Sequence, residues 1–453
     1  AYSTQTGALL STFDAGLDGD VYALTPGPTA GTVYVGGAFT NAGGVTTRRV
    51  ALLDVTTGKA VSTFRSPGFD GQVRGLEISG GRLLVGGSFA TAGGVAHAGL
   101  ASLNATTGKL DNYLNVQLAE HHNQNGGAQA PVGVMSMDIS PDGSKLVVIG
   151  NFRKADGLDR VQAAVINLDA GAASVSTWAT DRFVAPCFNW AFDTYMRSVD
   201  FAPDGSYFVI GTTGGGNSGT LCDSVSRWES NQSGSGLEPT WASYAGGDTI
   251  LSVAVSDTAV YAGGHQRWMN NAYGSDWAAQ GAVPRPGLAA LDTDSGVPLS
   301  WNPGRNPRGI GASALYVTAN GGVLVGSDTE WIGNFAFKRP RLAYFPGAGS
   351  QTASETQRKL PAEIYVAGRD GSTTGLSAGD FTGTKAYPVS DVDASGIDWS
   401  TVRGAFIVGD RLFLGLSSGT LAVSTLSGTS FGTPVAIDPY HDPAWATVAN
   451  GSG

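Results

Sequence analysis

The chain has 453 residues, of which 14 % are charged and 67 are glycine, and its formal net charge is −10. This acidic balance argues against nucleic acid and against an anionic membrane surface as partners, because both require lysines and arginines gathered on one face. No apolar run approaches the ~18 residues of a membrane span, so we expect no membrane insertion.

One apolar phrase that ends in glycine recurs along the chain. Residues 33–39 and 83–89 carry almost the same residues, Val-Tyr-Val-Gly-Gly-Ala-Phe and Leu-Leu-Val-Gly-Gly-Ser-Phe. Weaker copies stand at residues 146–152, 207–211, 260–264, 323–326 and 412–415. Short apolar runs that stop at glycine are typical of β-strands, and a phrase repeated this often indicates a repeat architecture.

Each copy is predicted to be the second strand of a four-stranded unit. A first strand precedes it, a third follows, and a fourth carries an aromatic residue; these aromatics are Phe13, Phe64, Tyr113, Trp178, Trp241 and Trp301. Four strands every ~50–60 residues are typical of the blades of a β-propeller. We interpret the glycines as sites of close backbone approach and the aromatics as filling between blades.

The pattern changes after residue 345. Residues 15–345 form six similar blades, 346–402 a linker with extra strands, 403–438 a seventh blade and 439–453 a tail. Residues 8–14 resemble a fourth strand without its own blade and are expected to help close the ring. The prediction is therefore an all-β chain with one domain, a seven-bladed propeller of four-stranded antiparallel blades.

The loops predict which face of the propeller is functional. First-to-second and third-to-fourth connections share one face and are short. The other face receives the long connections, which span residues 116–131, 179–194, 212–221, 265–285 and 327–340. Function concentrates on long loops held by a rigid scaffold, so ligands are expected on this face.

Aromatic residues in these loops are the candidate ligand contacts. They are Trp190, Trp268, Tyr273, Trp277 and Trp331, with His265 and Arg267 as polar neighbours. Aromatic faces beside amide and guanidinium donors suit a sugar ring, and they equally suit a protein interface. The alternative is that each aromatic packs within its own loop.

Catalytic and metal motifs are scarce. No nucleophile elbow, zinc motif or phosphate loop is present, so the sequence favours a binding module over an enzyme. Glu330 and Asp328 are secondary catalytic candidates, because two carboxylates ~5–9 Å apart would permit glycoside hydrolysis. Asp391, Asp393, Ser395 and Asp398 resemble a calcium loop that lacks its usual glutamate, and the alternative is a polar turn without cofactor.

Two cysteines, Cys187 and Cys222, are present in the whole sequence. With few lysines and many turns rich in Asn, Thr and Gly, they indicate an exported chain with one disulfide. The alternative is a pair of free thiols in a cytosolic protein.

Three longer phrases, at residues 187–195, 299–304 and 437–445, resemble a group of uncharacterised actinobacterial secreted proteins. In that group a β-propeller is often followed by PKD or laminin-G-like modules. The resemblance implies export, a surface or extracellular role, and a longer polypeptide of which this chain is a segment. We expect the chain itself to be monomeric. It brings no established catalytic residues.

The sequence supports three hypotheses of function. The first is an extracellular, non-enzymatic binding or adhesion module that recognises a glycan or a surface protein through its long loops. The second is a secreted carbohydrate-active enzyme, a hydrolase or lyase, that uses carboxylates on the same face. The third is a structural spacer in a larger surface protein.

Overall fold

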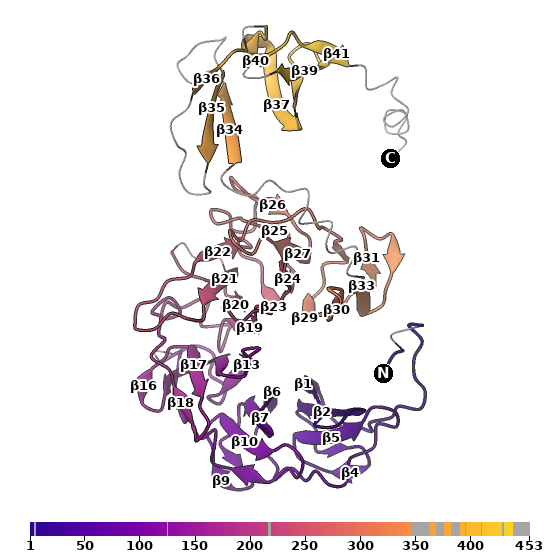
Figure 1. Cartoon of the computed structure of the whole chain (residues 1–453), viewed down its shortest axis with the longest axis vertical. Helices are drawn as coiled ribbons and strands as arrows, with labels where there is room; N and C mark the ends of the chain where they lie inside the picture. The colour runs from indigo at the N-terminus through magenta and orange to yellow at the C-terminus, as the bar shows by residue number, and fades with distance from the viewer. Residues whose placement is uncertain are drawn as a thin grey trace. The chain divides into compact units, whose positions relative to one another are not determined.

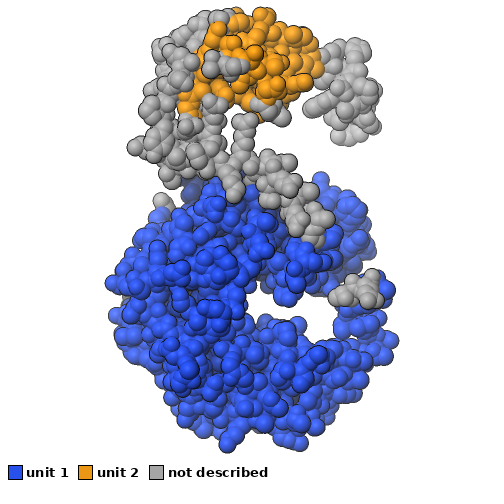
Figure 2. All heavy atoms as spheres, viewed as in Figure 1, with its two compact units in different colours: residues 1–357 blue, residues 358–453 orange. Residues whose placement is uncertain are grey.

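The structure, a computed structural model, describes residues 1–3, 6–124, 126–215, 219–346, 362–367, 376–381, 390–394, 396–408, 410–427 and 430–437. The chain divides into two compact units, residues 1–357 and 358–453 (Figure 2). Within the described ranges the one helix is a 3-10 segment, η1 (Trp399–Thr401), so the predicted all-β class is confirmed. No helix in those ranges has the length and apolar character needed to cross a membrane.

In the described residues of unit 1, six antiparallel sheets are each built around one copy of the glycine-ending phrase and follow one another along the chain. Their strands, sheet by sheet, are β1 (Val21–Pro26), β2 (Thr32–Gly37), β5 (Val50–Asp54); β6 (Val73–Ser79), β7 (Arg82–Gly87), β10 (Leu100–Asn104), β11 (Leu110–Asp111); β13 (Val134–Ile139), β14 (Lys145–Gly150), β17 (Ala163–Leu168), β18 (Ala173–Val175); β19 (Met196–Phe201), β20 (Tyr207–Thr212), β21 (Ser224–Glu229), β22 (Trp241–Tyr244); β23 (Ile250–Val255), β24 (Val260–Gly264), β27 (Leu288–Leu291); β29 (Ala312–Val317), β30 (Val323–Ser327), β33 (Leu342–Phe345). The second, third and fourth sheets have four strands, as the repeat predicts. In the first and fifth sheets the fourth strand is reduced to a single bridge, at Ala60 and Pro298.

The six sheets surround a central opening (Figures 1 and 2). Their first strands lie nearest to it, and each packs beside the first strand of the next sheet. Buried apolar clusters fill the spaces between consecutive sheets, and the predicted aromatics Phe64, Tyr113 and Trp178 each lie in one of them. The hydrophobic core is thus a series of layers between sheets, which is how a propeller buries its surface.

The glycines of the repeated phrase permit close packing of neighbouring sheets. A Cβ atom on Gly36 would lie 2.8 Å from Val73, and one on Gly86 would lie 2.6 Å from the sulfur of Met137, in each case on the next sheet. Any larger residue would therefore push the sheets apart, which confirms the structural interpretation of these glycines.

Small hairpins lie in the connections after the second strands, and two of them gain a third strand from the segment that precedes the first strand of the same sheet. They are β3 (Asn41–Ala42) with β4 (Val45–Thr46); β8 (Thr91–Ala92) with β9 (Val95–Ala96); β12 (Leu118–His121) with β15 (Phe152–Ala155) and β16 (Leu158–Asp159); β25 (Trp268–Met269) with β26 (Val283–Pro284); and β28 (Arg305–Asn306) with β31 (Trp331–Ile332) and β32 (Phe337–Lys338). The loop-bearing face predicted from the sequence is therefore built of ordered hairpins in these segments.

Every first strand in unit 1 has a β-bulge near its start. The pairing register shifts between Val73 and Gly75 in β6, and the other five first strands shift at the equivalent place. The bulged residues are Tyr22, Arg74, Met135, Arg197, Leu251 and Ser313. Because a bulge bends the strand and re-aims its side chain, the repeat offers one special position per sheet.

Unit 2 has two antiparallel sheets. Their strands are β34 (Ala362–Ala367), β35 (Leu376–Phe381), β36 (Ser390–Val392); and β37 (Val402–Val408), β38 (Arg411–Leu416), β39 (Leu421–Ser427), β40 (Ser430–Phe431), β41 (Val435–Ile437). Leu412 and Leu414 of the second sheet are buried together with Leu376 of the first. The register shifts between Val402 and Gly404, so β37 has the same bulge as the first strands of unit 1.

Two leucines of unit 1 are exposed to solvent, although the leucines at the equivalent positions of another sheet are buried. Leu24 in β1 is 66 % exposed, whereas Leu76, which holds the same register position in β6, is 3 % exposed. Leu342 in β33 is 43 % exposed, whereas its equivalent Leu100 is fully buried. One face of the first sheet and one of the sixth therefore present apolar side chains to solvent.

The N-terminal segment reproduces the end of a fourth strand. The amide of Phe13 donates to Leu10 at 3.2 Å and that of Asp14 to Thr57 at 3.2 Å, matching the bonds that Phe64 and Arg65 form in the next repeat. Residues 8–14 nevertheless form no strand, because they contain a turn and one isolated bridge, between Leu9 and Tyr2. The role of this segment in closing the ring, and the count of seven blades in one domain, stay predictions.

Candidate functional site

A cavity of 470 Å³ lies where the first four sheets of unit 1 approach one another. We call it the rim cavity; its polar lining includes Arg49, Asp70, Gln72, Arg74, Asn151 and Asp193. These residues come from the starts of first strands and from the segments after second strands, so the cavity opens on the face with the long loops.

Two arginines supply the positive charge of the rim cavity. Arg74 is the bulged residue of β6; its guanidinium lies 4.7 Å from the ring centre of Tyr22, and Nη2 donates to Gln72 at 2.7 Å. Arg49 donates from Nη1 to the Ala38 carbonyl, while its buried Nε has no hydrogen-bond partner. Neither arginine forms an ion pair with a carboxylate of the described residues.

The two carboxylates of the rim cavity are already engaged by the protein. Asp70 accepts the amides of Ala90 and Thr91, both at 2.9 Å. Burial raises the pKa of Asp70, but these hydrogen bonds outweigh burial and leave the pKa below its ordinary value. Asp193 accepts the Ala130 amide at 2.5 Å and lies 2.5 Å from Nε2 of His121. These acids hold loops in place, so the arginines are the groups open to a ligand.

Two long loops, residues 116–131 and 179–194, form one wall of the cavity. The side-chain amide of Asn123 donates to Ala128 at 2.8 Å and to Phe192 at 2.9 Å, and the Ala128 amide donates to Asn189 at 2.9 Å. Asn123 is buried, so these bonds are shielded from water. The loops therefore behave as one hydrogen-bonded body.

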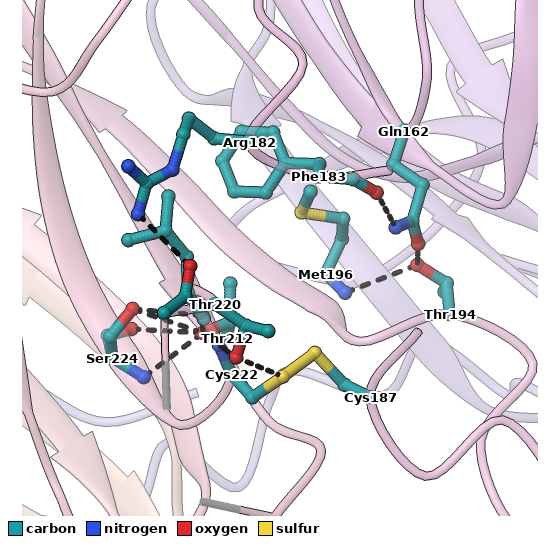
Figure 3. Close-up of a disulfide and its surroundings, with 12 residues drawn as sticks. Gln162, Arg182, Phe183, Cys187, Thr194, Met196, Thr212, Thr220, Cys222 and Ser224 are labelled. Carbon is teal, nitrogen blue, oxygen red and sulfur yellow. Dashed lines mark hydrogen bonds between the residues drawn. A yellow bond between two sulfur atoms is a disulfide. The ribbon is translucent and has the colours of Figure 1, made fainter. Parts of the chain in front are cut away.

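A disulfide between Cys187 and Cys222 anchors the second of these loops (Figure 3). The two Cα atoms are 5.8 Å apart, and both cysteines are buried. Thr220 donates its hydroxyl to the sulfur of Cys222 at 2.8 Å. The predicted pairing is confirmed, and it links the 179–194 loop to the segment that leads into β21.

The aromatic candidates fall into two groups. Trp190, Tyr273 and Trp277 are 73 %, 82 % and 60 % exposed. Trp190 lies 5.9 Å from the ring of Phe188, which is also exposed. Trp268 and Trp331 are half-buried. Trp190, Tyr273 and Trp277 are therefore exposed enough to stack on a ligand without rearrangement.

Arg267 forms ion pairs with two carboxylates, and His265 contacts a backbone carbonyl. Arg267 donates from Nε to the buried Asp248 at 2.9 Å and from Nη2 to Asp276 at 2.5 Å, and its guanidinium covers the Trp268 ring at 4.5 Å. Nδ1 of His265 lies 3.0 Å from the carbonyl of Ile310, and burial lowers the pKa of His265. The structure thus brings His265, Arg267 and Trp268 together, with most donors already used.

The secondary catalytic candidates have different surroundings. Asp328 accepts the Ile310 amide at 2.5 Å and the fully buried side chain of Arg305 at 3.1 Å. Burial raises the pKa of Asp328, but the amide bonds and Arg305 outweigh it and leave the pKa low. A general acid needs a raised pKa, so Asp328 is suited to holding its loop. Glu330 is exposed and lies 3.9 Å from Lys338.

The calcium candidates are only partly described. Ser395 and the side chain of Asp391 lie outside the described residues. Asp398 caps η1 by accepting the Ser400 amide at 3.1 Å, and Asp393 pairs through its backbone with Ser430. Among the described residues no group of three His, Cys, Asp or Glu side chains is placed to hold a metal ion.

Sequence reasoning missed the arginines of the rim cavity. Arg74 occupies the bulged position of its repeat, and Arg49 stands where the aligned repeats carry Gly99 and Gly287. Both departures are visible when the repeats are written above one another. That the two arginines face the same cavity cannot be seen in the sequence, because it depends on how four sheets meet.

Comparisons with known proteins agree on the type of fold. Residues 1–125 match the family described as Rax2 C-terminal beta propeller domain. No curated protein matches the sequence. Among solved structures, the crystal structure of the computationally designed Ika8 protein is similar at 13 % identity and a TM-score of 0.40, covering 92 % of this chain and 98 % of that one; a likeness at this level carries no argument. Together with the antiparallel sheets around a central opening, the family match identifies a β-propeller.

Proposed function

We propose that this chain is an extracellular, non-enzymatic binding module that holds a glycan on the loop-bearing face of its propeller. The observation that carries the proposal is the exposure of Trp190, Tyr273 and Trp277 on that face. Large exposed rings on anchored loops cost little conformational entropy when a ligand stacks on them. A surface protein in place of a glycan is the competing outcome of the test.

The anchoring of the loops supports recognition over a spacer role. The 179–194 loop is tied by the Cys187–Cys222 disulfide and by Asn123, although Trp190 at its tip packs mainly against Phe188. A loop fixed at its base with an apolar tip in water is typical of a binding surface. The disulfide also supports export, since such bonds persist in oxidising compartments.

The finer fold belongs to the same proposal. We take the sheet that begins with β37 as the seventh blade, because β37 repeats the bulge of the six first strands of unit 1. Residence at the cell surface, as a monomeric segment of a longer polypeptide, is part of this proposal. A catalytic role gains no support from Asp328, whose oxygens are engaged by Ile310 and Arg305.

A glycan array probed with the purified chain tests the proposal. We expect a restricted set of glycans to bind and Trp190→Ala to weaken the best of them about tenfold, the loss typical of one stacked ring. Tyr2→Ala, which removes an exposed aromatic outside the long loops, is the matched control. Binding of no glycan would refute the glycan assignment, and release of products from the bound glycan would refute the non-enzymatic one.

A further inference from the structure

The rim cavity contains hydrogen-bond donors that the protein does not use. Arg49 engages one carbonyl, that of Ala38, and leaves a buried Nε without a partner. Because this Nε is buried, a ligand in the cavity would have to meet the outer guanidinium nitrogens of Arg49. The guanidinium of Arg74, which lines the same cavity, contacts two uncharged side chains, Gln72 and Tyr22.

The backbone at Arg49 adds a second, independent observation. Arg49 has φ 76°, in the left-handed region, immediately before the third strand of its sheet. Glycine fills the equivalent place in the second and fifth sheets, as Gly99 at 84° and Gly287 at 78°. A bulky residue there is strained relative to glycine. Gln162, Asp223 and Arg341 carry side chains at the same position of other sheets, and of the four Arg49 is the one that lines the cavity.

The acceptors of the cavity do not compete for these donors. Asp70 accepts the amides of Ala90 and Thr91 on Oδ1, and Asp193 accepts the Ala130 amide and the Asn151 side chain and lies beside His121. Neither carboxylate forms an ion pair with Arg49 or Arg74. What the cavity presents to a ligand is therefore a pair of guanidinium groups with amide neighbours. Arginine pairs favour planar or tetrahedral oxyanions, to which they donate bidentate hydrogen bonds.

We propose that the rim cavity binds the acidic group of a sugar, a carboxylate or sulfate held between Arg49 and Arg74. The inference rests on the proposed function and specifies its ligand as an acidic glycan. The cavity volume of 470 Å³ is in the range of small-ligand sites and accommodates one sugar residue with its acidic group. Neighbouring sugar residues then extend toward the loop wall that carries Trp190.

Calorimetric titration with three probes tests this site. The probes are an oligosaccharide of galacturonic acid, its uncharged methyl ester, and sodium sulfate. Arg49→Gly removes the guanidinium and relieves the strained backbone, so we expect an unchanged or higher melting temperature together with at least about tenfold weaker binding of the acid. Arg74→Gln is expected to weaken binding similarly. Arg341→Gly is the matched control, because Arg341 has φ 65° at the equivalent position of the sixth sheet and does not line the cavity.

The outcomes separate this inference from the proposed function. Binding of the acid that is lost in both cavity variants and kept in Arg341→Gly supports the site. Equal affinity for the acid and its methyl ester, or unchanged affinity in both cavity variants, overturns the site and leaves glycan binding intact. Sulfate binding that depends on Arg49 and Arg74, with no saccharide bound, supports the anion site and overturns the glycan function.

Discussion

At the scale of single residues, the chain varies one strained position in its repeat. The residue before each third strand has a positive φ in all six sheets of unit 1, and its identity changes from sheet to sheet: Arg49, Gly99, Gln162, Asp223, Gly287 and Arg341. Glycine would serve the backbone at every one of them. The polar side chains that replace it are therefore informative. Gln162 is fully buried and bonds Phe183 and Thr194, which is a structural use, whereas Arg49 lines the rim cavity.

Asp223, at the same position of the fourth sheet, predicts a pH dependence of stability. Burial and the charge of Asp248 raise the pKa of Asp223 from 3.8 to about 7, against the opposing effect of Arg197. The folded state therefore holds this proton more tightly than the unfolded state does, and stability falls as the pH rises from about 4 to 7. We expect Asp223→Asn to stabilise the protein at pH 8 by on the order of 2 kcal/mol and to change little at pH 4.

Chemical denaturation at the two pH values measures this difference. Asparagine also tolerates the left-handed backbone that Asp223 adopts, at φ 49°. Asp257→Asn, on an exposed turn, is the control and should show no such dependence. A stabilisation of equal size at both pH values would contradict the buried-charge explanation.

At the scale of elements, the long loops are held by few but buried contacts. The 116–131 and 179–194 loops share Asn123 and Asp193 as links, and the disulfide ties the latter loop to the fourth sheet. Hydrogen bonds of this kind are shielded from water and hold a loop without regular secondary structure. The elements that carry Trp190 are consequently anchored at their base.

Removal of the disulfide measures how much of this anchoring is covalent. The two cysteines are separated by 35 residues in the sequence. Closing a loop of that size restricts the unfolded chain, so the double variant Cys187→Ser with Cys222→Ser should lose ~2–4 kcal/mol of unfolding free energy. Faster amide hydrogen exchange is expected in residues 179–194. Reductant should not change the stability of the double variant, and it should lower the stability of the wild type to that of the variant. Equal stability of oxidised and reduced wild type would contradict a stabilising role of the disulfide.

At the scale of the whole molecule, burial depends on which sheets are neighbours. Between consecutive sheets of unit 1 the register positions of Leu76 and Leu100 are buried, yet their equivalents Leu24 and Leu342 are exposed. An apolar blade face in water is unfavourable by roughly 25 cal/mol per Å². A seven-bladed ring, as proposed, would give these two faces a neighbour.

A matched pair of substitutions tests the seven-bladed ring. Leu76→Ala should cost about 2–5 kcal/mol, as for a leucine in a packed core. If a further blade covers the first sheet, Leu24→Ala should cost a similar amount, measured by denaturant unfolding of the whole chain. A cost near zero for Leu24→Ala, beside a large cost for Leu76→Ala, would show that the ring stays open at this sheet.

By itself, the sequence determined the repeat and the local features that depend on it. Apolar alternation, Gly-Gly stops and recurring aromatics predict six similar sheets, and the structure places Phe64, Tyr113 and Trp178 between sheets as expected. The cysteine pairing was also predictable, since two cysteines allow one disulfide. The repeat depends on residues that are close in the sequence, and the disulfide follows from the number of cysteines.

Only the tertiary structure decided which side chains form a site. Arg49 and Arg74 converge on the rim cavity because the first and second sheets meet there, and no spacing in the sequence encodes that meeting. Likewise, Asp328 and Arg267 look available in the sequence, and their buried partners Arg305 and Asp248 come from distant segments. A side chain's chemistry is set by its neighbours in space. For Arg49 and Arg74 these neighbours come from different sheets, and for Asp328 and Arg267 they come from the segment that precedes the first strand of the same sheet.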